Sequence, residues 1–181
     1  MSAPMEVGDG HGAEPAVRLR LAQARDAATI HRLIQDLARS LGSLEQVSST
    51  PLDFQRAATD PADFVALLAE RGAQAVGLCL YFYSFSSWRG RRGVYVQDIY
   101  VADSERGTGL GRRLMAEAAR RAAAAGASYL RLAVDRENQA AQDFYRSIGM
   151  QQAHRECIFM ARGDAFEALQ KVDKSVHKGR T

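Results

Sequence analysis

The chain has 181 residues, of which 46% are hydrophobic and 25% charged, a length and composition that predict one globular domain rather than a disordered or fibrous chain. No stretch approaches the ~18 consecutive apolar residues of a membrane span, and the first 14 residues lack the basic and apolar regions of a secretory signal. Because Cys79 and Cys157 make neither a disulfide framework nor a Cys-x-x-Cys motif, we expect a reducing, cytoplasmic setting.

The two ends of the chain carry opposite charges that cancel, so the net charge of +3 belongs to the residues between them. Residues 1–16 carry three acidic side chains and no Lys or Arg, whereas residues 171–181 carry four basic side chains against one acidic. Oppositely charged tails on a mildly basic body do not indicate a nucleic-acid partner. The expected organisation is a disordered N-terminal tail (1–16), one folded domain (17–172) and a basic C-terminal tail (173–181).

Periodicity of the apolar residues predicts the elements between the tails. The sequence predicts strands over residues 17–23, 75–85, 94–101, 129–134 and 150–160. It predicts helices from the N-cap Asp26 to Gly42 and over residues 51–58, 112–125, 139–147 and 164–172. Residues 60–70 fit either a helix or a strand paired across a turn at 71–74. The strand, helix and strand over 94–134 predict a right-handed βαβ unit inside a mixed sheet covered by helices.

A glycine-rich turn, Arg106-Gly107-Thr108-Gly109-Leu110-Gly111, stands inside this βαβ unit. Its glycines leave backbone N–H groups unobstructed at the positive end of a helix dipole, where a phosphate or pyrophosphate binds well. The turn lacks the Lys-Ser/Thr of a P-loop, and Arg112 stands where a Rossmann fingerprint needs its third glycine. A plain tight turn with glycines for left-handed backbone is the simpler alternative.

The pattern Arg106-x-x-Gly109-x-Gly111 after Ile99-Tyr100-Val101 resembles the acyl-CoA signature of the GNAT N-acetyltransferases. Asn138, Phe144-Tyr145 and Gly149-Met150 are similar to a later motif of that family. Residues 83–90 and 96–101 resemble one branch in particular, the diamine (spermidine/spermine) and thialysine acetyltransferases. The resemblance covers residues 17–169. It implies an α/β fold with a mixed, largely antiparallel sheet flanked by helices and splayed at the acetyl-CoA site, and it favours a strand over 64–70.

The resemblance also implies acetyl-CoA as the co-substrate. Its pyrophosphate and pantetheine arm would contact Ile99, Tyr100, Val101, Arg106, Gly107, Thr108, Gly109, Leu110, Gly111, Arg112 and Asn138. Asn138 could also cap the helix that begins at Gln139. Tyr145 matches the family's tyrosine that protonates the departing thiolate, and its alternative role is core packing. No histidine or cysteine has a catalytic pattern, and no metal site is expected.

The acceptor site implied by the resemblance contains Glu45, Trp88, Gln97 and Asp98. A polyamine site needs several carboxylates, but the family's acidic pair is here Gln97-Asp98. Adjacent strand residues point to opposite faces, so only one of this pair should enter the site. Three arginines follow Trp88 closely in the sequence: Arg89, Arg91 and Arg92. They either belong to a solvated turn or attract a carboxylate of the substrate. We therefore expect a small diamine or an amino-acid-like amine as the acceptor.

The expected function is transfer of an acetyl group from acetyl-CoA to a primary amine of a small molecule by direct attack, with no nucleic-acid or membrane partner. A protein lysine or N-terminal acetyltransferase and a non-catalytic acyl-CoA-binding sensor remain as alternatives. The resemblance also implies a homodimer in which subunits share either residues 150–160 or the acceptor-site loop.

Overall fold

The computed structural model describes residues 15–57, 63–154 and 156–171. The chain divides into two compact units, one ending at Asn138 and the other beginning at Gln139. Residues 1–14 of the expected N-terminal tail and all of the expected C-terminal tail lie outside the described residues. None of the described helices is long and apolar enough to cross a membrane.

The first unit is built on one five-stranded sheet with the strands in chain order. The strands are β1 (Val17–Leu21), β2 (Val65–Arg71), β3 (Gln74–Ser86), β4 (Arg91–Val101) and β5 (Ala127–Leu132). Successive strands are antiparallel from β1 to β4, and β5 runs parallel to β4. The expected mixed, largely antiparallel sheet is therefore confirmed. The strand favoured over 64–70 is also confirmed, as β2, because these residues pair with both β1 and β3.

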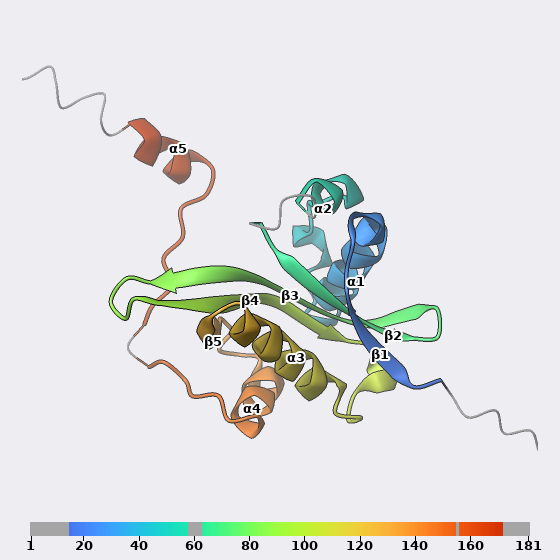
Figure 1. Cartoon of the computed structure of the whole chain (residues 1–181). Coiled ribbons are helices and arrows are strands. Elements are labelled where there is room, and N and C mark those ends of the chain that lie inside the picture. The colour runs from blue at the N-terminus through green and yellow to red at the C-terminus, as the bar shows by residue number, and fades with distance from the viewer. Residues whose placement is uncertain (1–14, 58–62, 155, 172–181) are drawn as a thin grey trace, which may run out of the picture. The chain divides into compact units, whose positions relative to one another are not determined.

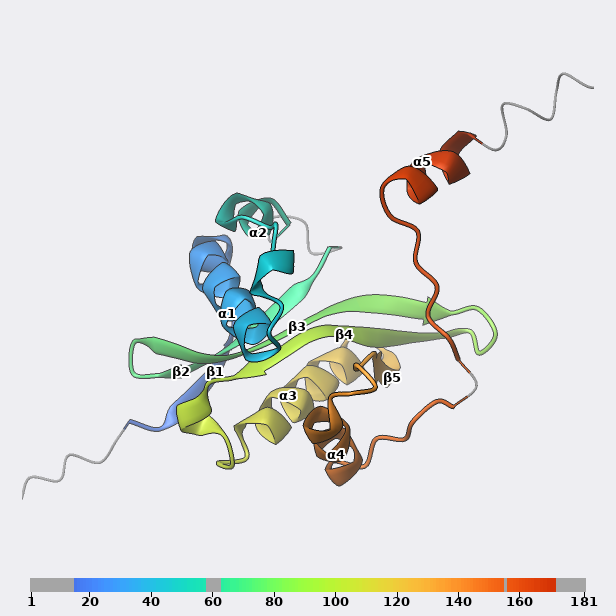
Figure 2. The ribbon, with the colours of Figure 1, turned by 180° about the vertical axis from the view of Figure 1, so that it is seen from behind.

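Helices cover both faces of this sheet (Figure 1), and the view from behind shows the same layers (Figure 2). On one face lie η1 (Ala24–Asp26), α1 (Ala27–Ser40), η2 (Leu44–Gln46) and α2 (Pro51–Ala57); η3 (Asp103–Glu105) and α3 (Leu110–Ala124) follow β4. Ile30 and Leu33 of α1 are fully buried in a cluster with Leu78 and Leu80 of β3. On the other face a Cβ on Gly77 would lie 3.2 Å from Leu114 Cδ1, so this glycine allows the close approach of α3.

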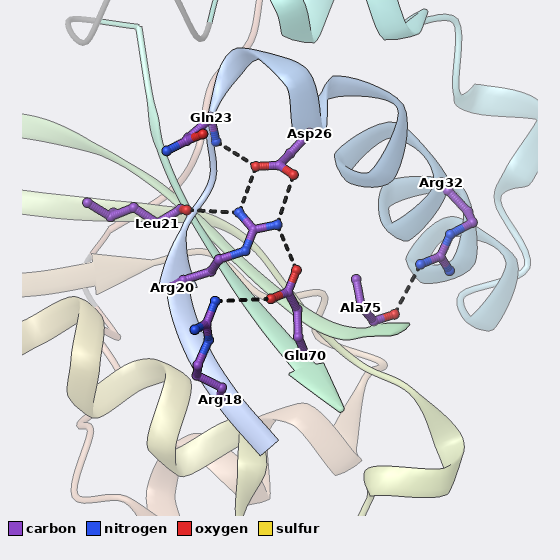
Figure 3. Close-up of polar contacts among 8 residues, drawn as sticks. All are labelled: Arg18, Arg20, Leu21, Gln23, Asp26, Arg32, Glu70 and Ala75. Carbon is purple, nitrogen blue, oxygen red and sulfur yellow. Dashed lines mark hydrogen bonds and ion pairs between the residues drawn. The ribbon is translucent and has the colours of Figure 1, made fainter. Parts of the chain in front are cut away.

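The sequence predicts Asp26 as the N-cap of α1, and Asp26 has that position, but its side chain makes no cap hydrogen bond to the helix. Its carboxylate instead accepts the Gln23 N–H at 2.7 Å and binds the Arg20 guanidinium at 2.7 and 2.8 Å (Figure 3). Arg20 also binds Glu70 of β2 at 2.6 Å. This ion-pair network, which lowers the pKa of Asp26, ties β1 to β2 and to the start of α1. A sequence cannot reveal a partner 50 residues away, such as Glu70 for Arg20.

The second unit contains α4 (Gln139–Ser147), which has the predicted bounds, and α5 (Asp164–Lys171). The predicted strand over 150–160 is wrong for the residues described there, 150–154 and 156–160, since none of them is in a strand. An apolar run becomes a strand only where another strand completes its backbone hydrogen bonds. Within the described part of this unit there is no such strand, and Phe159 is 94% exposed.

Candidate active site

A bulge interrupts β4 at Gln97. Val96 pairs with Tyr81 and Asp98 pairs with Leu80, so Gln97 has no counterpart on β3. Bulges of this kind redirect side chains and are common near active sites. Gln97 is exposed, whereas Asp98 is partly buried. Directly paired residues share a face of the sheet, so Asp98 lies with Leu80 on the face covered by α1.

The pairing of β4 with β5 ends just before this bulge. The last register pair is Val96 with Leu132, while β4 continues to Val101. Over residues 97–101, the edge of β4 that faces β5 therefore has no strand partner in the described part of the chain. Main-chain groups on an open edge can pair with an extended ligand as they would with a strand. Ile99, Tyr100 and Val101 all lie on this open stretch.

The glycine turn follows β4 and η3 directly. Gly107 and Gly109 have φ angles of 77° and 84°, and Gly109 is the N-cap of α3. No described atom lies within 4 Å of a Cβ placed on either residue. Gly111 is different, because it lies inside α3 and is not among the glycines with positive φ. Left-handed backbone explains Gly107 and Gly109 but not Gly111, where alanine would favour the helix by ~0.5–1 kcal/mol.

A ligand that approaches the first turn of α3 accounts for all three glycines. The first N–H groups of any helix lack acceptors in a preceding turn, and these donors suit a pyrophosphate. Arg106 and Arg112 are exposed beside them, and Arg106 pairs with Asp103 at 2.9 Å. Leu110 is fully buried, so only its main chain could contact a ligand. The turn thus offers donors suited to an anion, and the open β4 edge offers main-chain groups suited to an extended, amide-bearing ligand.

Thr108 has a structural role as well. Its hydroxyl donates to the Glu105 carbonyl at 2.7 Å, and its N–H donates to the same oxygen at 3.3 Å. The Glu105 side chain is almost completely buried and binds Arg71 of β2. Sequence reasoning did not identify Glu105 or Arg71, because 34 residues separate them and neither belongs to the glycine motif.

Burial shapes the acid–base properties of the site. It raises the pKa of Asp98 to about 6, because the charged carboxylate loses water. It also raises the pKa of the Cys79 thiol to about 12, which leaves this residue protonated and unreactive at neutral pH. Among the described residues no three His, Cys, Asp or Glu side chains form a potential metal site.

Two of the expected acceptor-site features lie far from Asp98 within one chain. Trp88 is 99% exposed in the turn that joins β3 to β4. This end of the hairpin is six residues along β3 from the partner of Asp98, or roughly 20 Å at ~3.3 Å per residue. Three arginines occupy the same end: Arg89, Arg91 and Arg92. Arg92 packs over the Tyr83 ring at 5.1 Å. Whether these arginines attract a substrate carboxylate stays a prediction.

The remaining expected site residues are placed as follows. Glu45 is exposed on η2, the short helix after α1. Asn138 is half-buried directly before α4, and its N–H donates to the Asp135 carbonyl at 3.1 Å. Tyr145 is half-buried on α4 in the second unit, where its ring lies 5.3 Å from that of Phe144.

Sequence comparison identifies the class of protein, an acyl-transfer enzyme. Residues 30–150 match the model of the Acetyltransferase (GNAT) family. The chain belongs to this family, and it is an N-acetyltransferase of the GNAT type.

Individual relatives and structures are consistent with this assignment. The chain is 34% identical over 166 residues to the thialysine N-epsilon-acetyltransferase of Bos taurus, an alignment that covers 84% of this chain and 96% of the relative. It is 29% identical over 140 residues to the human spermidine/spermine N(1)-acetyltransferase-like protein 1, covering 73% of this chain and 20% of the relative. The resemblance to the diamine and thialysine branch is thus confirmed.

The fold is also that of solved structures. The integron cassette protein VCH_CASS6 from the mobile metagenome of V. cholerae matches with a TM-score of 0.72 and 19% sequence identity, over 86% of this chain and 98% of that one.

Proposed function

We propose that this enzyme transfers the acetyl group of acetyl-CoA to the primary amine of a small diamine or an amino-acid-like molecule. The observation that carries the proposal is the position of Asp98, a partly buried carboxylate at the bulge of β4, where the strand edge becomes open. The names of two relatives, a thialysine N-epsilon-acetyltransferase and a spermidine/spermine N(1)-acetyltransferase-like protein, support a small amine as the acceptor.

The cofactor-binding residues are those of the open edge and the glycine turn. The main chain of Ile99, Tyr100 and Val101 would pair with the pantetheine amides, and Asn138 would assist. The first turn of α3 and the residues from Arg106 to Arg112 would hold the pyrophosphate. Acetyl-CoA supplies a thioester whose carbonyl is activated toward an amine.

Asp98 is the base in this proposal. An amine attacks only when neutral, so the bound ammonium must lose a proton. With a pKa of about 6, Asp98 is ionised at neutral pH, holds the ammonium and accepts its proton. The adjacent Gln97 is an amide and cannot do so. One carboxylate at the bulge suits one ammonium group, which favours a short amine over a polycation.

Tyr145 is the general acid in this proposal, a role that rests on the family resemblance. A phenol with a pKa near ~10 is protonated at neutral pH and can donate to the departing thiolate. Attack by the amine is direct, with no acyl-enzyme on Cys79, because that thiol is buried and protonated.

A substrate screen tests the proposal. The protein is incubated with acetyl-CoA and short diamines, lysine, ornithine, thialysine, spermidine, spermine or a lysine-containing peptide, and thiol release is followed at fixed ionic strength. We expect the highest kcat/KM for a small amine, since this ratio reports transition-state discrimination. A value for spermine or spermidine tenfold above every small amine would contradict the acceptor assignment. Turnover of the peptide alone would indicate a protein acetyltransferase, and coenzyme A binding without any turnover would indicate a sensor.

A further inference from the structure

A buried carboxylate stands immediately before the glycine turn. Glu105, the last residue of η3, is only 2% exposed. A buried negative charge needs a paired cation, and more so next to a site that suits an anion. Arg71, the last residue of β2, supplies it: its Nε donates to Glu105 Oε1 at 2.5 Å and its Nη2 donates to Oε2 at 2.8 Å.

The same two residues also anchor the surrounding chain. The third nitrogen of Arg71, Nη1, donates at 2.8 Å to the carbonyl of Pro15, two residues before the start of β1. The main-chain carbonyl of Glu105 accepts both the N–H and the hydroxyl of Thr108. Glu105 is thus fixed to the sheet by its side chain, while its main chain fixes the glycine turn.

We infer that Arg71 and Glu105 form a positioning pair that sets the conformation of the glycine turn and thereby the affinity for the coenzyme A pyrophosphate. This inference rests on the proposed function, because it takes the turn as the pyrophosphate site. Neither residue touches the ligand in this account; both act through Thr108 and the main chain of the turn. The planar fork of arginine matches the carboxylate in a way that lysine cannot.

The charges in this pair make the single and double variants differ in a characteristic way. The Arg71 guanidinium lowers the pKa of Glu105, so the carboxylate stays ionised at neutral pH. Arg71→Met leaves that buried charge without its hydrogen-bonded partner, although Arg113 still acts on it at longer range, and this destabilises the fold and repels a pyrophosphate. The double variant Arg71→Met/Glu105→Gln removes both charges, and replacing a buried ion pair by neutral groups is often tolerated. Its stability should recover, but its turn is no longer held in place.

The experiment measures three quantities for each variant: the dissociation constant for coenzyme A by calorimetry, the Tm, and deuterium uptake of residues 103–110 in the ligand-free protein. We expect Arg71→Met to raise the dissociation constant about tenfold or more. The double variant should regain most of the lost Tm but still bind coenzyme A several-fold more weakly and exchange faster in 103–110. Compared with Arg71→Met, Arg71→Lys should regain more of the lost stability than of the lost affinity for coenzyme A. At saturating acetyl-CoA, kcat should change less than KM.

Glu70→Gln is the matched control. Glu70 is the neighbour of Arg71 on β2, and it is also partly buried and paired with an arginine, Arg20, at 2.6 Å (Figure 3). This variant should lower the Tm while leaving the coenzyme A dissociation constant within about twofold of the parent protein.

The inference is overturned if the double variant binds coenzyme A as the parent does with unchanged exchange in 103–110, or if Glu70→Gln weakens binding as much as the double variant. A parent protein that does not bind coenzyme A would refute the proposed function instead. In that case exchange of the turn in the ligand-free Arg71 variants still decides whether the pair positions it.

Discussion

Asp98→Asn should stabilise this protein at neutral pH while it impairs catalysis. Burial raises the pKa of Asp98 from 3.8 to about 6, so the native state disfavours the charged carboxylate. At 1.36 kcal/mol per pKa unit, ionised Asp98 lowers the free energy of unfolding by about 3 kcal/mol. Asn has nearly the same shape and no charge to desolvate, so the variant should recover part of this energy, about 1–3 kcal/mol.

The gain depends on pH with a definite sign. Between about pH 4 and pH 6 the native protein keeps Asp98 protonated while the unfolded chain is already ionised. The native state therefore binds more protons, and the stability of the parent protein falls as pH rises through this window. The stabilisation by Asn should be fully present above about pH 6 and should vanish below about pH 4.

Urea unfolding of both proteins at pH 4 and pH 8 measures this difference. Gln97→Glu is the matched control, because it adds a carboxylate at the exposed neighbouring position and should shift stability by less than about 0.5 kcal/mol at either pH. Equal effects of Asp98→Asn at the two pH values would refute the desolvation argument.

The same variant tests the catalytic role. In the parent, kcat/KM should rise with pH as Asp98 ionises near pH 6, whereas Asp98→Asn should lose that limb and about 10²–10⁴ in rate. Unchanged activity would mean that another group or water accepts the ammonium proton.

Three further predictions concern other parts of the site. Gly109→Asp should abolish coenzyme A binding, and with it the stabilisation of about 2.7 kcal/mol expected when coenzyme A is at a hundred times its Kd; a thermal shift assay measures both. The control is Gly126→Asp, at another open glycine with positive φ (81°), which should strain the backbone similarly but retain binding. Tyr145→Phe should keep the fold and lower kcat about 10- to 1000-fold, while an unchanged kcat with chemistry shown to be rate-limiting would assign the proton to another donor. Trp88→Ala should change kcat/KM less than about twofold if one chain forms the acceptor site, because the hairpin end is roughly 20 Å from Asp98; a large loss would place Trp88 in an acceptor site after all.

The sequence determined the elements whose signals are local. Apolar runs predicted β3 and β4, and the spacing of the glycines predicted a turn at the N-terminus of α3. The helix predicted over residues 51–58 begins at Pro51, where the Asp53 carboxylate accepts the Thr50 N–H at 2.8 Å. These features depend on neighbours within about four residues, so the sequence contains all the interacting groups.

Tertiary structure decided whatever depends on distant partners. Residues 60–70 were ambiguous in isolation, and only pairing with β1 and β3 makes 65–71 a strand. Residues 150–160 carried an equally plausible strand pattern, but those described there lack a partner strand and remain irregular. The adjacency of Gln97 and Asp98 predicted opposite faces, but the bulge and the fold around it decided that Asp98 is the partly buried one. The Arg71–Glu105 pair lies beyond any local signal, because burial and long-range contact exist only once the sheet and α3 have assembled.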